Sequence, residues 1–164
     1  MNSDLKIFLS EIDSRVNENM EYSSDKKYLF DSSVCYCDGF NDTNPGTKGG
    51  WTIASYYNEK ETLFSVYTIE KENFTNNEAE LLGVLYAARF AKNNTTIYTD
   101  SQNTMLWIKR AGRLLQLKSR PDLTKTAKIC FDIINEKHLK LEWVCREKNI
   151  AGMFNDKFNP IGEF

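Results

Sequence analysis

The feature that most constrains the fold is the short apolar run of residues 33–37, which ends abruptly in the dipeptide Asp38-Gly39. A run of this length with β-branched and aromatic residues is typical of a buried strand. Burying a carboxylate costs free energy unless a hydrogen bond or an opposite charge compensates for it. We therefore expect Asp38 to lie at the end of a central strand, and later parts of the chain to supply partners for its carboxylate.

Length and composition indicate one soluble globular domain. The chain has 164 residues, of which 41% are hydrophobic and 27% are charged, and no apolar run approaches the ~18 residues needed to span a bilayer. The N-terminus lacks the basic region and apolar core of a secretory signal, so we expect a cytoplasmic protein without a membrane partner. The four cysteines and single histidine have no zinc-binding spacing, and we interpret the thiols as packing residues.

The net charge of the whole chain gives no sign of a nucleic-acid partner, because it is only −2. Basic residues nevertheless concentrate locally. Residues 109–128 include seven lysines and arginines against the single acid Asp122. We interpret this run as a solvated helical face, and the alternative is contact with an acidic substrate bound at a neighbouring site.

The spacing of apolar residues predicts the order of the elements. Residues 5–20 have apolar positions three and four apart, which indicates an amphipathic helix that packs on the domain. We therefore divide the chain into an N-terminal helical extension, residues 1–27, and a main domain, residues 28–164. The predicted strands are 33–37, 51–57, 62–69, 95–99 and 139–145, the predicted helices are 75–93, 101–113, 123–135 and 152–158, and residues 40–50 are predicted to be a loop.

This order predicts an α/β fold with a five-stranded mixed sheet, in which three antiparallel strands precede two parallel ones and helices cover the faces. Asp38 and Asp100 each end a strand, and Glu80 lies in the helix between them, so the three can meet. Carboxylates at such close range repel unless cations lie between them. Ligand sets made of oxygen atoms favour Mg²⁺ or Mn²⁺, and two such ions about 3.5–4 Å apart are the arrangement used for in-line phosphoryl transfer.

Three ordered segments carry a family resemblance. Asp38-Gly39 is followed by the turn Asn44-Pro45-Gly46, residues 75–81 read Thr-Asn-Asn-Glu-Ala-Glu-Leu, and residues 99–102 read Thr-Asp-Ser-Gln. These segments are similar to the motifs of type 1 ribonuclease H, the endonuclease that cuts the RNA strand of RNA–DNA hybrids. The resemblance extends over about residues 33–158 and implies the fold, the activity and the site residues of that family.

The resemblance implies four catalytic, metal-ligating carboxylates. Three match motif positions, and they are Asp38, Glu80 and Asp100. Asp156 is the best match for the fourth because no other aspartate follows the last predicted strand, and Glu147 is the alternative. Many members of the family have a histidine in this loop, and this chain has none there. Arg146 and Glu147 are the candidates to assist in its place.

By resemblance, the protein uses two Mg²⁺ ions, with Mn²⁺ as a substitute. Asp38 and Asp156 would hold an ion that activates water, while Asp38, Glu80 and Asp100 would hold a second ion at the departing 3′ oxygen, giving 5′-phosphate and 3′-hydroxyl ends. Recognition of RNA is expected to use its 2′-hydroxyl groups. The expected substrate contacts are Gly39, Asn44, Thr75, Asn76, Asn77, Ser101 and Gln102.

Two alternative functions remain open. One is a nuclease of the same fold with another substrate, such as a junction resolvase or a 3′ exonuclease. The other is a weakly active or non-catalytic module that binds nucleic acid. For the main function we expect a monomer that binds RNA–DNA hybrid. The helix within residues 1–27 has two alternative roles, packing on the domain or docking a protein partner.

Overall fold

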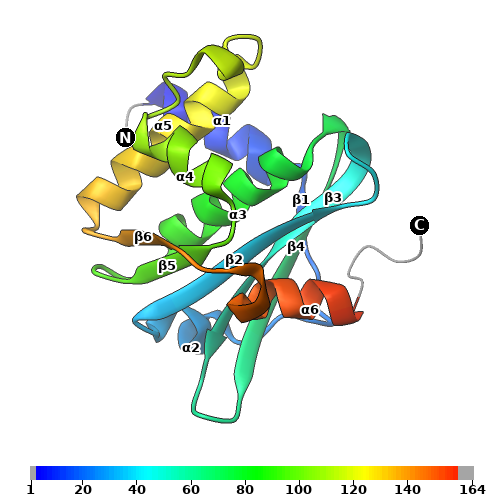
Figure 1. The fold of residues 1–164 in the computed structure, drawn as a ribbon, viewed down its shortest axis with the longest axis vertical. Coiled ribbons are helices and arrows are strands. Elements are labelled where there is room, and N and C mark those ends of the chain that lie inside the picture. Colours follow the sequence, from blue (N-terminus) through cyan, green and yellow to red (C-terminus); the bar gives the residue numbers. More distant parts are fainter. Residues whose placement is uncertain (1–2, 159–164) are drawn as a thin grey trace.

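The computed structural model describes residues 3–158, so residues 1–2 and 159–164 of the two predicted units lie outside it. Within this range the chain forms one six-stranded mixed sheet with helices on both faces (Figure 1). The strands are β1 (Val16–Glu18), β2 (Val34–Asn41), β3 (Gly46–Tyr56), β4 (Thr62–Phe74), β5 (Thr96–Thr99) and β6 (Lys140–Trp143). The helices are α1 (Ser3–Asp13), α2 (Lys26–Asp31), α3 (Asn76–Phe90), α4 (Gln102–Lys109), α5 (Pro121–Glu136) and α6 (Ile150–Phe158), with 3₁₀ turns η1 (Leu115–Leu117) and η2 (Arg146–Lys148).

The sheet has the predicted mixture of directions. Its strand order is β1-β4-β3-β2-β5-β6. Strands β2, β3 and β4 form an antiparallel meander, and β5 and β6 add to β2 as parallel strands. The difference from the prediction is β1, a sixth strand that pairs antiparallel with the outer edge of β4.

Two local predictions were wrong. The N-terminal helix does not reach residue 20 but ends at Asp13, and residues 16–18 form β1. The predicted loop 40–50 is mostly strand, because β2 runs to Asn41 and β3 begins at Gly46. In both places the long-range pairing of strands overrides the local preference that suggested a helix or a loop.

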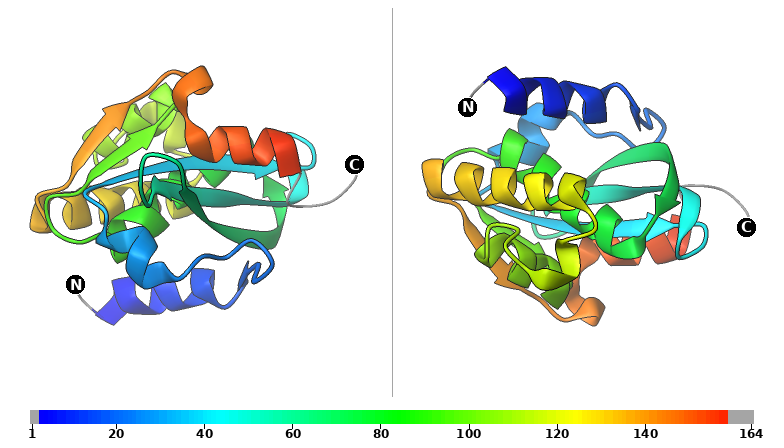
Figure 2. Two further views of the ribbon diagram at one scale, coloured as in Figure 1. Left: turned by 90° about the horizontal axis from the view of Figure 1, so that it is seen from below. Right: turned by 90° about the horizontal axis from the view of Figure 1, so that it is seen from above.

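The helices form two layers around the sheet. Helix α3 lies against its centre with every residue from Glu78 to Ala88 buried, and α5 packs on α3. Figure 2 shows α1 on this side of the sheet and α6 on the opposite face. The main core lies between the sheet and α3, and it includes the buried free thiols of Cys35, Cys37 and Cys130. Among the described helices, none has the length and apolar character needed to cross a membrane.

Candidate active site

Three carboxylates meet where β2 and β5 lie side by side. Strands β2 and β5 are parallel with Tyr36 opposite Tyr98, so Asp38 and Asp100, each two residues further along, reach the same height in the sheet. Glu80 approaches from the start of α3. One oxygen from each of Asp38, Glu80 and Asp100 lies within 4.8 Å of the other two. The structure therefore brings together three of the four carboxylates singled out in the sequence.

Gly39 allows α3 to approach the sheet at this point. A Cβ atom at Gly39 would lie 2.5 Å from the backbone nitrogen of Glu80 and 2.6 Å from the carbonyl carbon of Ala79. No side chain fits there. The Asp-Gly pair thus combines a ligand with the space for the helix that carries the next ligand, and Glu80 becomes buried directly beside Asp38.

The surroundings of the carboxylates disfavour their charged forms. Burial raises the pKa of Asp38 to about 6, and the charge of Asp100 acts in the same direction. Burial, followed by the charges of Asp38 and Asp100, raises the pKa of Glu80 well above its usual value. Burial also raises the pKa of Asp100, against a hydrogen bond from Asn149 and the positive charge of Arg146. Three acids held in this way are best stabilised by a bound cation.

The donor set fits a hard divalent cation. All three cluster residues offer carboxylate oxygens, which are the ligands that Mg²⁺ and Mn²⁺ prefer. In addition, the Oε2 atom of Glu80 is buried and has no hydrogen-bond partner among residues 3–158. A buried polar atom without a partner is costly, and a metal ion between the carboxylates would provide one.

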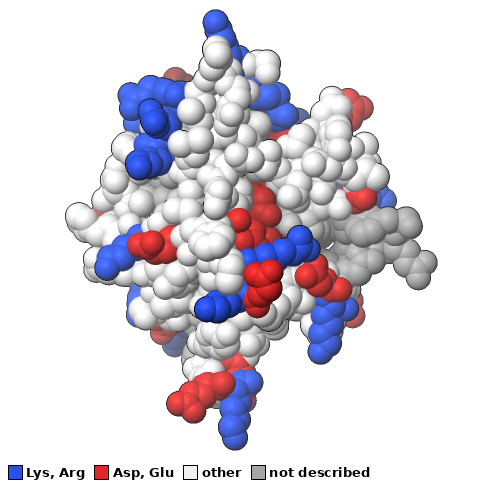
Figure 3. All heavy atoms as spheres, in the orientation of Figure 1, with Lys and Arg blue, Asp and Glu red and all other residues white. Residues whose placement is uncertain are grey.

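Asp156, the predicted fourth carboxylate, lies at the rim and not in the cluster. Its side chain is 64% exposed and forms an ion pair of 3.4 Å with Arg146. Its negative charge still contributes to the raised pKa of Asp100. Arg146 lies in η2 and lowers the pKa of both Asp38 and Asp100. Glu147, the alternative ligand, is exposed in the same turn. Figure 3 shows the acidic side chains gathered near the middle of this face with basic side chains beside them.

Two asparagines contact the carboxylates and were missed in the sequence. The Nδ2 atom of Asn155 donates to Oδ2 of Asp38 at 2.9 Å, and the Nδ2 atom of Asn149 donates to Oδ2 of Asp100 at 3.2 Å. Asn149 directly precedes α6 and Asn155 lies within it, each three residues from Gly152, where the helix comes close to Asp38. The two asparagines flanking this glycine are the signal that could have found them.

Four of the seven predicted substrate contacts, Asn76, Asn77, Ser101 and Gln102, line a cavity next to the cluster. This open cavity of about 380 Å³ is lined by Asn76, Asn77, Glu80, Asp100, Ser101, Gln102 and Asn103. Asn103 was missed because it falls one residue beyond the recognised motif. Thr75 and Ser101 are also N-caps, since their side chains accept hydrogen bonds from the backbone at Glu78 and Thr104. Such caps stabilise helix starts.

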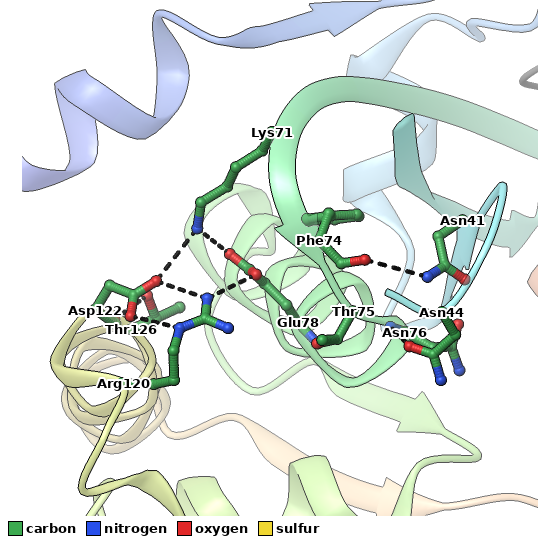
Figure 4. A network of polar contacts seen from close by, with 10 residues as sticks. All are labelled: Asn41, Asn44, Lys71, Phe74, Thr75, Asn76, Glu78, Arg120, Asp122 and Thr126. Carbon is green, nitrogen blue, oxygen red and sulfur yellow. Dashed lines mark hydrogen bonds and ion pairs between the residues drawn. The ribbon is translucent and has the colours of Figure 1, made fainter. Parts of the chain in front are cut away.

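The turn before β3 is tied to the start of α3 (Figure 4). Asn44 Oδ1 accepts a hydrogen bond of 3.0 Å from the backbone of Asn76. Asn41 donates to the carbonyl oxygen of Phe74 at 3.3 Å. Two of the predicted contact residues, Asn44 and Asn76, are thus fixed to each other at the edge of the cavity.

The basic run of residues 109–128 is not one helical face, as the sequence had suggested. It spans the end of α4, η1 and the first half of α5. Within it, Arg120 faces inward and binds Glu78, a buried residue of α3, at 2.9 Å. Lys71 contacts the same carboxylate and Asp122 lies beside both cations (Figure 4).

A family model and several solved structures are similar to this chain, and all of them are of RNase H. The model of the RNase H family matches residues 31–153. No curated protein matches the chain. Among solved structures, similar folds occur in RNase H1 from the archaeon Halobacterium salinarum (21% identity, 72% of this chain and 89% of that one, TM-score 0.52) and in the N-terminal RNase H domain of a Mycobacterium tuberculosis protein (20%, 72% and 90%, 0.55). LC11-RNase H1 in complex with RNA/DNA hybrid is also similar (22%, 78% and 97%, 0.54).

Proposed function

The chain belongs to the RNase H family, and we propose that it is an endonuclease that hydrolyses the RNA strand of RNA–DNA hybrids with the help of divalent metal ions. The observation that carries this proposal is the cluster of Asp38, Glu80 and Asp100, whose oxygens lie within 4.8 Å of one another. The fold supports it, because one of the similar solved structures is an RNase H1 in complex with RNA/DNA hybrid.

We propose that the clustered Asp38, Glu80 and Asp100 would hold one ion. A second ion would lie between Asp38 and Asp156, which is outside the cluster, exposed at the rim and paired with Arg146. When bound, two Mg²⁺ or Mn²⁺ ions supply an activated water and stabilise the leaving 3′ oxygen, which gives 5′-phosphate and 3′-hydroxyl ends. Arg146 would neutralise part of the acidic charge at the rim and favour the ionised, metal-binding forms of Asp38 and Asp100.

The polar cavity beside the cluster is where the substrate would bind. Its amide and hydroxyl groups, from Asn76, Asn77, Ser101 and Gln102, can both donate and accept hydrogen bonds. Groups of this kind can recognise the 2′-hydroxyl that distinguishes RNA from DNA. Because these residues lie next to Glu80 and Asp100 in one cavity, an RNA strand bound there would have its backbone beside the metal ligands.

Cleavage assays on four labelled substrates test the proposal. The protein is incubated with RNA–DNA hybrid, duplex DNA, duplex RNA and single-stranded RNA, each with Mg²⁺, with Mn²⁺ or with EDTA. We expect metal-dependent cutting of the hybrid alone, and its loss in Asp38→Asn, which removes the charge of the central ligand but keeps its shape. Cutting of duplex DNA would indicate a different nuclease, and hybrid binding without cutting would indicate a binding module.

A further inference from the structure

Helix α6 packs closely against β2, the strand that carries Asp38. It contacts β2 and β3, and at Gly152 a Cβ atom would lie only 3.2 Å from Oδ2 of Asp38. A larger residue at this position would therefore press on the carboxylate. The absence of a side chain at Gly152 allows its neighbours on the same helix face to reach the acidic cluster.

Asn155 connects Asp38 to the strand beside it. Its Nδ2 atom donates to Asp38 Oδ2 at 2.9 Å, and its Oδ1 atom accepts from the hydroxyl of Thr52 at 2.5 Å. Thr52 lies directly opposite Asp38 in the β2–β3 register and is fully buried. Because the amide oxygen of Asn155 accepts from the Thr52 hydroxyl, its amide nitrogen is turned toward the carboxylate. Hydrogen bonds are thus donated in one direction, from Thr52 to Asn155 and from Asn155 to Asp38.

Asn149 makes the equivalent contact with the second strand. Its Nδ2 atom donates to Asp100 Oδ2 at 3.2 Å and to the carbonyl oxygen of Cys37 at 3.0 Å. Its Oδ1 atom accepts from the backbone of Ala151 at 3.1 Å, and the residue is fully buried. One asparagine thus joins β2, the residue after β5 and the start of α6.

We propose that Asn155 in α6 and Asn149 directly before this helix are positioning residues, whose amide groups fix the rotation of the two aspartate ligands Asp38 and Asp100. An amide N–H stabilises a carboxylate without adding negative charge to a cluster of three acids. Partners of this kind orient metal ligands, and their loss typically lowers metal affinity or activity about 10–100-fold. The proposal rests on the proposed metal-dependent function.

Asn155→Ala and Thr52→Val test this chain of contacts, and Thr52→Ser is the matched control because it keeps the hydroxyl. Asn155 is only half-buried, so its replacement leaves the core intact, whereas Asn149 is too deeply buried for a clean test. Mn²⁺ affinity is measured by calorimetry on the free protein, and kcat and KM are measured on RNA–DNA hybrid at saturating Mn²⁺. We expect Mn²⁺ affinity or kcat to fall about 10-fold in Asn155→Ala, less in Thr52→Val, with recovery in Thr52→Ser and unchanged KM.

The outcomes separate this proposal from the proposed function. If the wild-type protein neither binds Mn²⁺ nor cuts hybrid, the proposed function fails. If the wild-type protein does both, and Asn155→Ala and Thr52→Val retain its Mn²⁺ affinity and kcat, the asparagine has no positioning role even when both variants melt at a lower temperature. If one variant does not fold, the other decides the question.

Discussion

At the scale of single residues, the acids that make the site functional also destabilise the folded protein when no metal is bound. Asp38, Glu80 and Asp100 have oxygens within 4.8 Å of one another, and burial raises the pKa of each. Repulsion from neighbouring carboxylates adds to this effect, from Asp100 on Asp38, from Asp38 and Asp100 on Glu80, and from Asp156 on Asp100. A residue whose pKa is raised by folding loses stabilising free energy when it ionises. At neutral pH the empty cluster therefore stores repulsion, which a divalent cation would relieve.

For Asp38 the direction of the pH effect follows from its pKa. The pKa is about 6 in the folded protein against an ordinary value of 3.8, so the folded state holds this proton more tightly than the unfolded chain. Protonated Asp38 therefore stabilises the folded protein. This contribution to the free energy of unfolding is complete below pH 3.8 and is lost as the pH rises through about 6. We expect Asp38→Asn to stabilise the metal-free protein at pH 7.5, by on the order of 1–2 kcal/mol, and to have much less effect at pH 4.5.

Urea unfolding of both proteins at the two pH values, with EDTA, measures this difference. Mg²⁺ at pH 7.5 provides the control, because it should raise the free energy of unfolding of the wild-type protein more than that of Asp38→Asn. If the free energy of unfolding of Asp38→Asn at pH 7.5 is equal to or lower than that of the wild-type protein, the ionised Asp38 does not destabilise the metal-free fold.

At the scale of elements, the start of α3 is fixed by a charge network behind the site. Glu78, which is only 3% exposed, binds Lys71 from β4 and Arg120 at the entry to α5 (Figure 4). Asp122 shares both cations. Because Glu78 lies two residues before Glu80, this network holds the turn of α3 that carries both a metal ligand and the asparagines of the cavity.

Breaking this network should cost much more than breaking an exposed ion pair. Arg120→Ala leaves the buried Glu78 with only one cation, and removal of one partner from a buried pair typically costs about 3 kcal/mol. We expect a loss of roughly 2–3 kcal/mol in the free energy of unfolding, since Arg120 is 30% exposed and water can partly replace it. Lys128→Ala is the matched control: its pair with Asp132 within α5 is about half exposed and is worth about 0.5 kcal/mol or less.

Urea denaturation of Arg120→Ala, Lys128→Ala and the wild-type protein under the same conditions measures both losses. A loss in Arg120→Ala no larger than that in Lys128→Ala would mean that the network does not stabilise the first turn of α3.

At the scale of the whole molecule, the sequence predicted the parts that depend on local pattern and not those that depend on contacts across the fold. The three clustered acids were found because each belongs to a recognisable motif, with Asp38 in β2, Asp100 directly after β5 and Glu80 near the start of α3. Asn149 and Asn155 were not, because an amide acquires its role only through the close approach of α6 to β2. Strand β1 was missed because Val16 continues the helical spacing of α1, and three residues become a strand only when β4 pairs with them.

The N-terminal segment is joined to the rest of the molecule by both its elements. Asp13, the last residue of α1, makes two hydrogen bonds of 2.8 and 2.9 Å to Arg89 and also accepts one from Tyr86, both in α3. Leu9 is buried in the main core, and β1 covers the edge of β4. These contacts favour the role of a packing element over that of a docking element held ready for a partner.

Deletion of residues 1–18 distinguishes the two roles, because it removes α1 and β1 but keeps α2. Burying one leucine contributes about 1.5–3 kcal/mol and the charged pair of Asp13 and Arg89 a further 1–3 kcal/mol, so we expect the free energy of unfolding to fall by on the order of 3 kcal/mol.

None of these contacts touches Asp38, Glu80 or Asp100. The cleavage rate on RNA–DNA hybrid at 20 °C should therefore stay within about twofold of the wild-type rate, since a factor of two corresponds to only about 0.4 kcal/mol in the activation barrier. Asp13→Ala, which removes the ion pair with Arg89 and the hydrogen bond from Tyr86 but keeps α1 and β1, should lower stability by less than the deletion and keeps the test valid if the deletion does not fold. Unchanged urea unfolding of the deletion variant would instead identify the segment as an accessory that the domain does not need for stability, and would favour a docking role.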